Sequence, residues 1–170
     1  MEQKQTFSQD TLLKLLKQSE LTIIAGADKH VAPFTEYLKS KYRTVCREIC
    51  LPPVGGCTDA ADAESSDGIR LYTLFRRDGY ESSDGAGFIG SQAQAAAGEP
   101  VVVMFPCEKH AEWRSLYFRI DGDVKGKTQL LLLNVRDADR VDLVIERGEH
   151  AGECIPFRFD EAAKRYYEAE

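Results

Sequence analysis

The sequence predicts an α+β fold of mixed α/β character, in which one sheet is covered by helices on one or both faces. Two observations carry this prediction. The first fifty residues alternate between amphipathic and continuous apolar segments, as helices and buried strands do. Later runs alternate apolar with polar residues, which is typical of antiparallel sheets that have one solvated face. We expect a single domain over 1–170, with an antiparallel β-meander over 99–159 and a closing C-terminal helix over 160–170.

The N-terminal segment, residues 1–51, is expected to form a helix, a strand, a second helix and a second strand. Asp10 can cap the first helix, and the apolar run Leu21–Ala25 is typical of a buried strand. Apolar side chains at helical spacing then predict a helix over 31–42, and residues 44–51 return to strand. These side chains are Val31, Phe34, Leu38 and Tyr42. A strand–helix–strand unit of this length permits a parallel strand pair with a right-handed crossover.

Two segments, 52–68 and 79–98, are rich in Gly, Ser, Asp and Pro or Ala, and we expect loops there. Residues 69–76 alternate between apolar and polar side chains, so a strand should lie between the two loops. Five further strands are expected before the closing helix. They are Val101–Phe105, Leu116–Asp121, Thr128–Val135, Val141–Glu146 and Glu153–Phe159.

The overall charge favours a protein partner over nucleic acid or membrane. The formal net charge is −6 at pH 7, whereas nucleic-acid affinity depends on clustered Lys and Arg. No segment reaches the ~18 apolar residues that span a bilayer, and Lys14 and Lys17 interrupt the early leucine run. The odd cysteine count predicts reduced thiols and a cytoplasmic location. We therefore expect a basic protein partner.

Cysteines and histidines form the most site-like pattern of the chain, and zinc prefers four such ligands. The residues concerned are Cys46, Cys50, Cys57, Cys107 and His110. In a strand, however, Cys46 and Cys50 stand ~13 Å apart, because each residue advances ~3.3 Å. One zinc ion with bonds of ~2.3 Å cannot reach both, and neither can a disulfide. We expect no metal; a helix continuing through Cys50 would instead bring both thiols together.

Two weaker patterns suggest chemistry elsewhere. A histidine can activate a nearby thiolate, which makes Cys107 and His110 candidates for a catalytic pair. Residues 85–90 match G-x-G-x-x-G, and a helix beginning at Ser91 could present its first N–H groups to an anion. The expected strand ends eight residues before this match, which favours a flexible loop. No G-x-x-x-x-G-K-[ST] motif occurs, and we expect no cofactor.

The favoured function is that of a small acidic protein-binding protein, for example an inhibitor or a toxin-neutralising immunity-type protein. The candidate contact surface is the acidic loop with Asp59, Asp62, Glu64 and Asp67. Charges on such a loop mainly raise the association rate with an oppositely charged partner. The alternative is a thiol-dependent enzyme using Cys107 and His110, or a small-ligand or nucleotide-binding domain at the Gly85–Gly98 loop.

Overall fold

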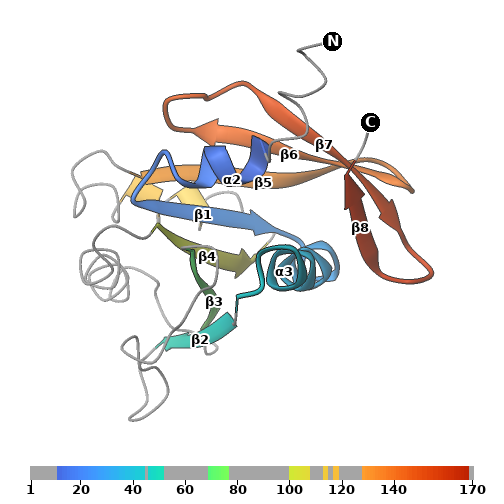
Figure 1. Ribbon diagram of the computed structural model, residues 1–170, viewed down its shortest axis with the longest axis horizontal. Coiled ribbons are helices and arrows are strands. Elements are labelled where there is room, and N and C mark those ends of the chain that lie inside the picture. Colours follow the sequence, from blue (N-terminus) through green and yellow to red (C-terminus); the bar gives the residue numbers. More distant parts are fainter. Residues whose placement is uncertain are drawn as a thin grey trace.

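The computed structural model describes residues 11–44, 46–51, 69–76, 100–107, 113–114, 117–118 and 128–168. In chain order, the helices and strands are α2 (Thr11–Leu16), β1 (Leu21–Gly26), α3 (Asp28–Tyr42), β2 (Cys46–Leu51), β3 (Arg70–Arg76), β4 (Val101–Pro106), β5 (Thr128–Asp137), β6 (Arg140–Arg147), β7 (Cys154–Asp160) and β8 (Arg165–Glu168). The strands belong to one mixed sheet (Figure 1) in the order β2-β3-β4-β1-β5-β6-β7-β8.

The sheet has a parallel part and an antiparallel part. Strands β2, β3, β4, β1 and β5 run parallel to one another, and β6, β7 and β8 continue the sheet as antiparallel neighbours. The sheet twists so strongly that β8 comes to lie beside α3 (Figure 1). This curl brings the last strand of the chain against the first β–α unit.

The predicted α+β class is wrong, because the antiparallel run of the described strands extends from β5 to β8 and does not begin at residue 99. Strand β4 lies inside the parallel part, between β3 and β1, and β5 also pairs with β1 in parallel. The side chains Val101–Phe105 are buried without alternation, which is the pattern of a strand covered on both faces. Alternating polarity is therefore a property of β6 and β7 and not of the whole second half.

The predicted closing helix over 160–170 is also wrong. A turn over 161–164 leads instead into β8, which pairs with β7. Lys164 adopts the left-handed conformation (φ 56°), and the Ala163 N–H donates to Asp160 Oδ1 at 3.1 Å. Tyr166 is buried between two exposed neighbours, so the period of this segment is two and not 3.6.

A further strand, expected over 116–121, is contradicted where the structure describes it. Tyr117 and Phe118 have helical backbone, as do Trp113 and Arg114. In residues 11–51, helix, strand, helix and strand follow one another in the expected order. The predicted loops at 52–68 and 79–98 lie outside the described residues, and the single domain over 1–170 stays a prediction.

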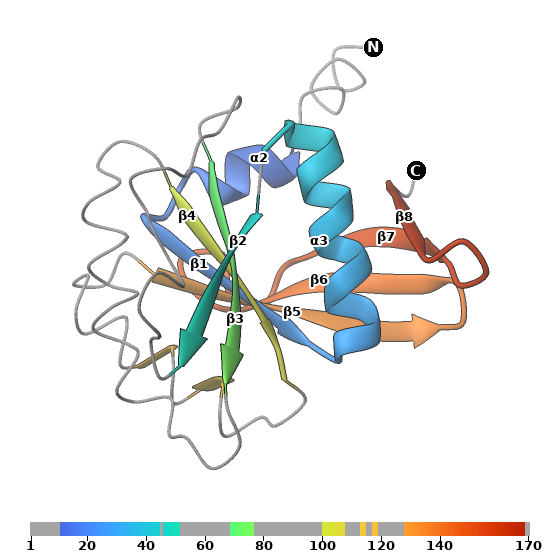
Figure 2. The same cartoon turned by 90° about the horizontal axis from the view of Figure 1, so that it is seen from below.

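Two apolar clusters lie on opposite faces of the sheet, because neighbouring residues of a strand point to opposite sides. Helices α2 and α3 pack into one cluster with Ile24, Val102 and Leu131. Trp113 and Tyr117 join the other cluster with Ile23 and Val103. Figure 2 shows α3 lying across the parallel strands, with β7 and β8 beside it. None of the described helices is long and apolar enough to cross a membrane.

Candidate functional site between α3 and β8

A groove of about 630 Å³ lies between one face of α3 and the hairpin that ends in β8. Its charged and aromatic lining comprises Glu36, Tyr37, Lys41, Lys164, Arg165 and Tyr167. The volume falls within the range of about 300–1,000 Å³ that is usual for ligand pockets. Groove and lining belong to elements that the structure describes from end to end, apart from the side chain at the end of β8.

The helical period of α3 produces one wall of the groove. Positions 33, 36, 37, 40 and 41 fall on one side of the helix and line the groove, while Phe34 and Leu38 face the core. The other wall is β8, in which Arg165 and Tyr167 are exposed on either side of buried Tyr166. The groove therefore follows from an amphipathic helix lying opposite an alternating strand.

Tyr166 forms the floor between these walls. Its ring centroid lies 5.1 Å from that of Phe34 and 4.8 Å from that of Phe159. Its hydroxyl donates to the His30 carbonyl oxygen at 3.2 Å. Burial raises the pKa of the Tyr166 phenol well above its ordinary value of 10.0, so the group is neutral at physiological pH. The floor is apolar, hydrogen-bonded and firmly packed.

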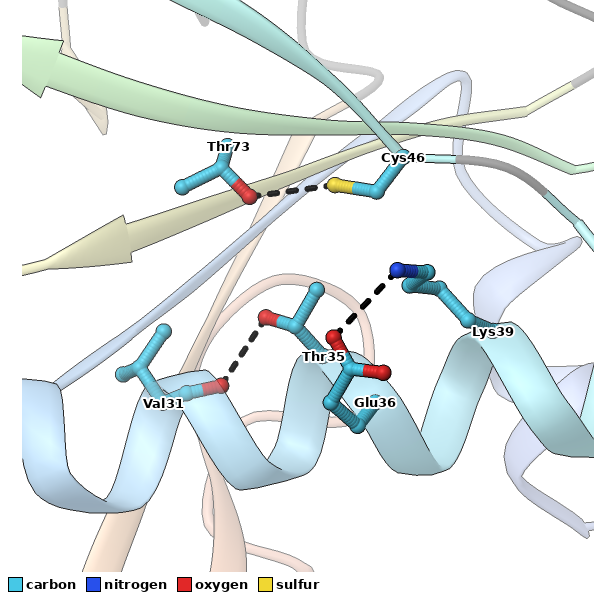
Figure 3. Close-up of polar contacts among 6 residues, drawn as sticks. All are labelled: Val31, Thr35, Glu36, Lys39, Cys46 and Thr73. Carbon is cyan, nitrogen blue, oxygen red and sulfur yellow. Dashed lines mark hydrogen bonds and ion pairs between the residues drawn. The ribbon is translucent and has the colours of Figure 1, made fainter.

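The rim of the groove is positively charged, although the whole chain carries −6. Lys41 Nζ lies 5.9 Å from the Tyr37 ring centroid, and the Arg165 guanidinium lies 5.6 Å from that of Tyr167. The carboxylate of Glu36 accepts a hydrogen bond from Lys39 Nζ at 3.3 Å (Figure 3). The rim therefore carries three cations and one carboxylate, and this local excess of positive charge favours an anionic ligand.

His30 lies in the first turn of α3, behind this floor. Its ring is 5.2 Å from that of Phe159, and Nδ1 makes no hydrogen bond within the described part of the chain. Burial lowers the pKa of His30, the charge of Lys29 lowers it further, and Glu161 opposes the shift. The fold therefore favours the neutral imidazole.

A test of this burial is the pH dependence of stability. Because the folded-state pKa is depressed, His30 contributes stability above pH ~6.5 that is lost as pH falls through the folded-state value. Wild type should lose more free energy of unfolding than His30→Gln when urea denaturation at pH 7.5 is compared with pH 5. Parallel losses in the two proteins would show that His30 is not protonated on unfolding.

The cysteines and histidine weighed above as candidate zinc ligands are not brought together in the described part of the chain. Strand β2 begins at Cys46 and includes Cys50, so the backbone between these two positions is extended. Cys46 Sγ lies 3.0 Å from Thr73 Oγ1 on β3 (Figure 3). Cys57 and His110 lie outside the described residues. No three metal-binding side chains cluster among the residues that the structure describes.

Cys107, the candidate nucleophile, directly follows β4 and is half-buried. Its N–H donates to the Gly26 carbonyl oxygen at 2.8 Å, and its side chain packs against the apolar cluster of Trp113. The structure holds Cys46, Cys107 and Cys154 as thiols. Because His110 lies outside the described residues, a Cys107–His110 pair stays a prediction.

The carboxyl ends of parallel strands are a second place where ligands bind in α/β sheets. Here Ala27 alone connects β1 to α3, and Asp28 places a carboxylate in the first turn of the helix. At Gly26 (φ 156°), an added Cβ would meet Leu133 Cβ at 3.2 Å. One residue cannot encircle a phosphate, and Asp28 would repel one. The Gly85–Gly98 loop lies outside the described residues.

Sequence reasoning missed the α3–β8 groove. The acidic residues that it selected lie outside the described residues: Asp59, Asp62, Glu64 and Asp67. A signal for β8 was nevertheless present, because Tyr166 and Tyr167 are of a residue type enriched in strands. These two residues lie inside the segment for which a helix was expected.

Comparison with known proteins finds a similar fold but no matching family. No protein-family model matches the chain, and no curated protein matches it in sequence. Among solved structures, the crystal structure of the RadB recombinase is similar with a TM-score of 0.50 and 11% sequence identity. The match covers 94% of this chain and 97% of that chain. At this identity the likeness shows the fold alone: this chain is built on a sheet architecture similar to that of a recombinase.

Proposed function

We propose that this chain acts by binding a protein partner, and that the α3–β8 groove is a contact surface. The observation that carries the proposal is the position of the groove along β8, the last strand of the sheet order. Edge strands are templates for pairing with another chain. Tyr and Arg, which are enriched at protein interfaces, both line this groove.

Long-range charge contributes a separate part of the proposal. A net charge of −6 favours encounter with a basic partner, as an inhibitor or immunity-type protein would require. The acidic residues Asp59, Asp62, Glu64 and Asp67 stay the predicted steering surface, and their effect would be screened over ~8–10 Å at physiological salt. The reduced thiols expected from the odd cysteine count fit a cytoplasmic location.

Site-specific photo-crosslinking in cells tests where a partner binds. A photoreactive phenylalanine analogue replaces Tyr167 in the groove, or Asp62 in the acidic segment. Val135 on β5 is the matched control, because it is 47% exposed and Tyr167 is 43% exposed. We expect one discrete protein adduct from position 167 and none from position 135. Equal adduct patterns at all three positions, or none, would contradict a specific partner at either surface.

Two other functions have less support from the described residues. The recombinase likeness suggests nucleotide binding, but the single-residue turn at Ala27 leaves no phosphate-binding loop between β1 and α3. The thiol-enzyme alternative needs a base beside Cys107, and the described neighbours of this thiol are core residues of the sheet. Loss of a measurable turnover in Cys107→Ala would favour the enzyme over the binding protein.

A further inference from the structure

We infer that the partner segment entering the groove is extended and acidic, and that it adds to the free edge of β8 as a ninth strand. This inference rests on the proposed function, since it names the chemistry of the segment that the groove would take. Three features of the described residues support it: an edge strand open on one side, cations beside that edge, and an aromatic floor.

The open edge provides main-chain partners. Strand β8 pairs with β7 from Arg165, opposite Asp160, to Glu168, opposite Phe157. On its other side no described strand follows, so no strand that the structure describes pairs with the backbone N–H and C=O groups along that side. Four residues at ~3.4 Å each give an edge of ~14 Å, which matches an incoming segment of four or five residues. Added strands bind other sheet edges in this way.

The charges beside this edge select an acidic segment. Lys164 and Arg165 lie where β8 begins, and neither forms an ion pair with any residue that the structure describes. The carboxylate of Glu36 is directed to Lys39. Carboxylates on the incoming strand would lie opposite Arg165, and opposite charges across neighbouring strands stabilise a pair.

A second copy of this chain is the competing occupant of this edge. Two β8 strands in parallel would bring Arg165 of both copies together, and such like charges discourage pairing. An antiparallel pair would instead place Arg165 opposite Glu168 of the other copy, and opposite charges across neighbouring strands stabilise a pair. A dimer of the full chain that the acidic peptide dissociates would therefore assign the edge to a second copy and overturn the inference.

The side chains of such a segment alternate between two environments. Every second residue of the segment would lie on the face of the sheet where Arg165 and Tyr167 are exposed. The residues between them would lie on the buried face, where Tyr166 packs on Phe34. A sequence that alternates carboxylate with apolar side chains therefore matches the groove. Its recognition combines main-chain pairing with charge and aromatic contact.

The probe is an acetylated and amidated hexapeptide that alternates Glu and Val, titrated into the full chain. We expect saturable binding, with slower amide hydrogen exchange at Arg165–Glu168. A peptide with Lys for Glu should not bind measurably. Two further peptides carry N-methyl groups, one on the odd-numbered and the other on the even-numbered residues. Only one of these two methylated frames removes the N–H donors that face β8, so that peptide should bind at least tenfold more weakly. Unchanged exchange at β8, or equal binding of both methylated frames and the parent, would overturn the inference.

The variant for this titration is Lys164→Asn with Arg165→Gln, since Asn tolerates the left-handed conformation at position 164. The control is Lys14→Asn with Lys17→Gln, which removes the same charge from exposed positions that do not line the groove. We expect about tenfold weaker peptide binding in the first protein only, from two exposed ion pairs. Equal affinities would overturn the charge selection, and so would wild-type binding that does not weaken as salt is raised.

The result distinguishes this inference from the proposed function. If position 167 crosslinks to a protein in cells but the acidic peptide does not bind, the chain binds a partner by another chemistry. If position 167 captures nothing while the peptide slows exchange at β8, the edge accepts acidic strands but the proposed cellular role fails. Preferential binding of a single-stranded oligothymidine at the groove would overturn both.

Discussion

Phe34→Ala should lower the free energy of unfolding by ~3–5 kcal/mol, a range typical of buried Phe truncations. Phe34 is fully buried in the first long helix, and its ring contacts aromatic rings from two strands. The centroid distances are 5.2 Å to Phe157 and 5.1 Å to Tyr166, both in edge-to-face geometry. Truncation removes these contacts and leaves a cavity between α3 and the β7–β8 hairpin.

Urea denaturation followed by circular dichroism measures the loss. Phe118→Ala is the matched control, because Phe118 is 49% exposed and its replacement should change the free energy of unfolding by less than ~1 kcal/mol. Equal losses in the two variants would mean that the hairpin is not held by the aromatic cluster. Since Phe34 also packs on Tyr166, the groove variants described above avoid this position.

The sequence predicted the elements of residues 11–51 well because each has a strong local pattern. The spacing of Val31, Phe34 and Leu38 is that of a helix, and Leu21–Ala25 is an uninterrupted apolar run. These patterns depend on neighbours a few residues away, so they can be recognised without knowing the sheet order.

The sheet order itself depends on contacts that no local pattern contains. Strand β4 pairs in parallel with β1, which precedes it by about eighty residues. The run Val101–Phe105 is compatible with either type of sheet until its neighbours are known. A helix was expected over 160–170, but pairing of residues 165–168 with β7 and burial of Tyr166 give a strand instead.

The groove could not be predicted for the same reason. Its two walls are separated by more than 120 residues, and only the curl of the sheet brings Arg165 near Lys41. The overall charge of −6 directed attention to carboxylates, whereas the described groove is lined by cations. A net charge describes the long-range field of a chain and not the local charge of one site.

Gln129→Leu should lower the free energy of unfolding by ~1–3 kcal/mol, the usual cost of leaving a buried polar group without its hydrogen bond. Gln129 is buried on β5, and its Nε2 donates to two groups from other elements. The acceptors are the Leu15 carbonyl oxygen at 3.0 Å and Thr22 Oγ1 at 2.9 Å. Leucine preserves the apolar packing but removes the donor, so α2 and β1 lose their polar link to β5.

A second substitution separates hydrogen bonding from packing. Adding Thr22→Val to Gln129→Leu removes the orphaned hydroxyl and should recover part of the loss, because an apolar pair of similar shape costs less than one unsatisfied partner. Gln18→Leu, at an exposed position, is the control and should leave the urea midpoint nearly unchanged. The contradicting result is a double variant that loses more free energy of unfolding than the two single variants lose together. The defect would then lie in packing around β5, and the amide of Gln129 would not be what joins α2 to the parallel sheet.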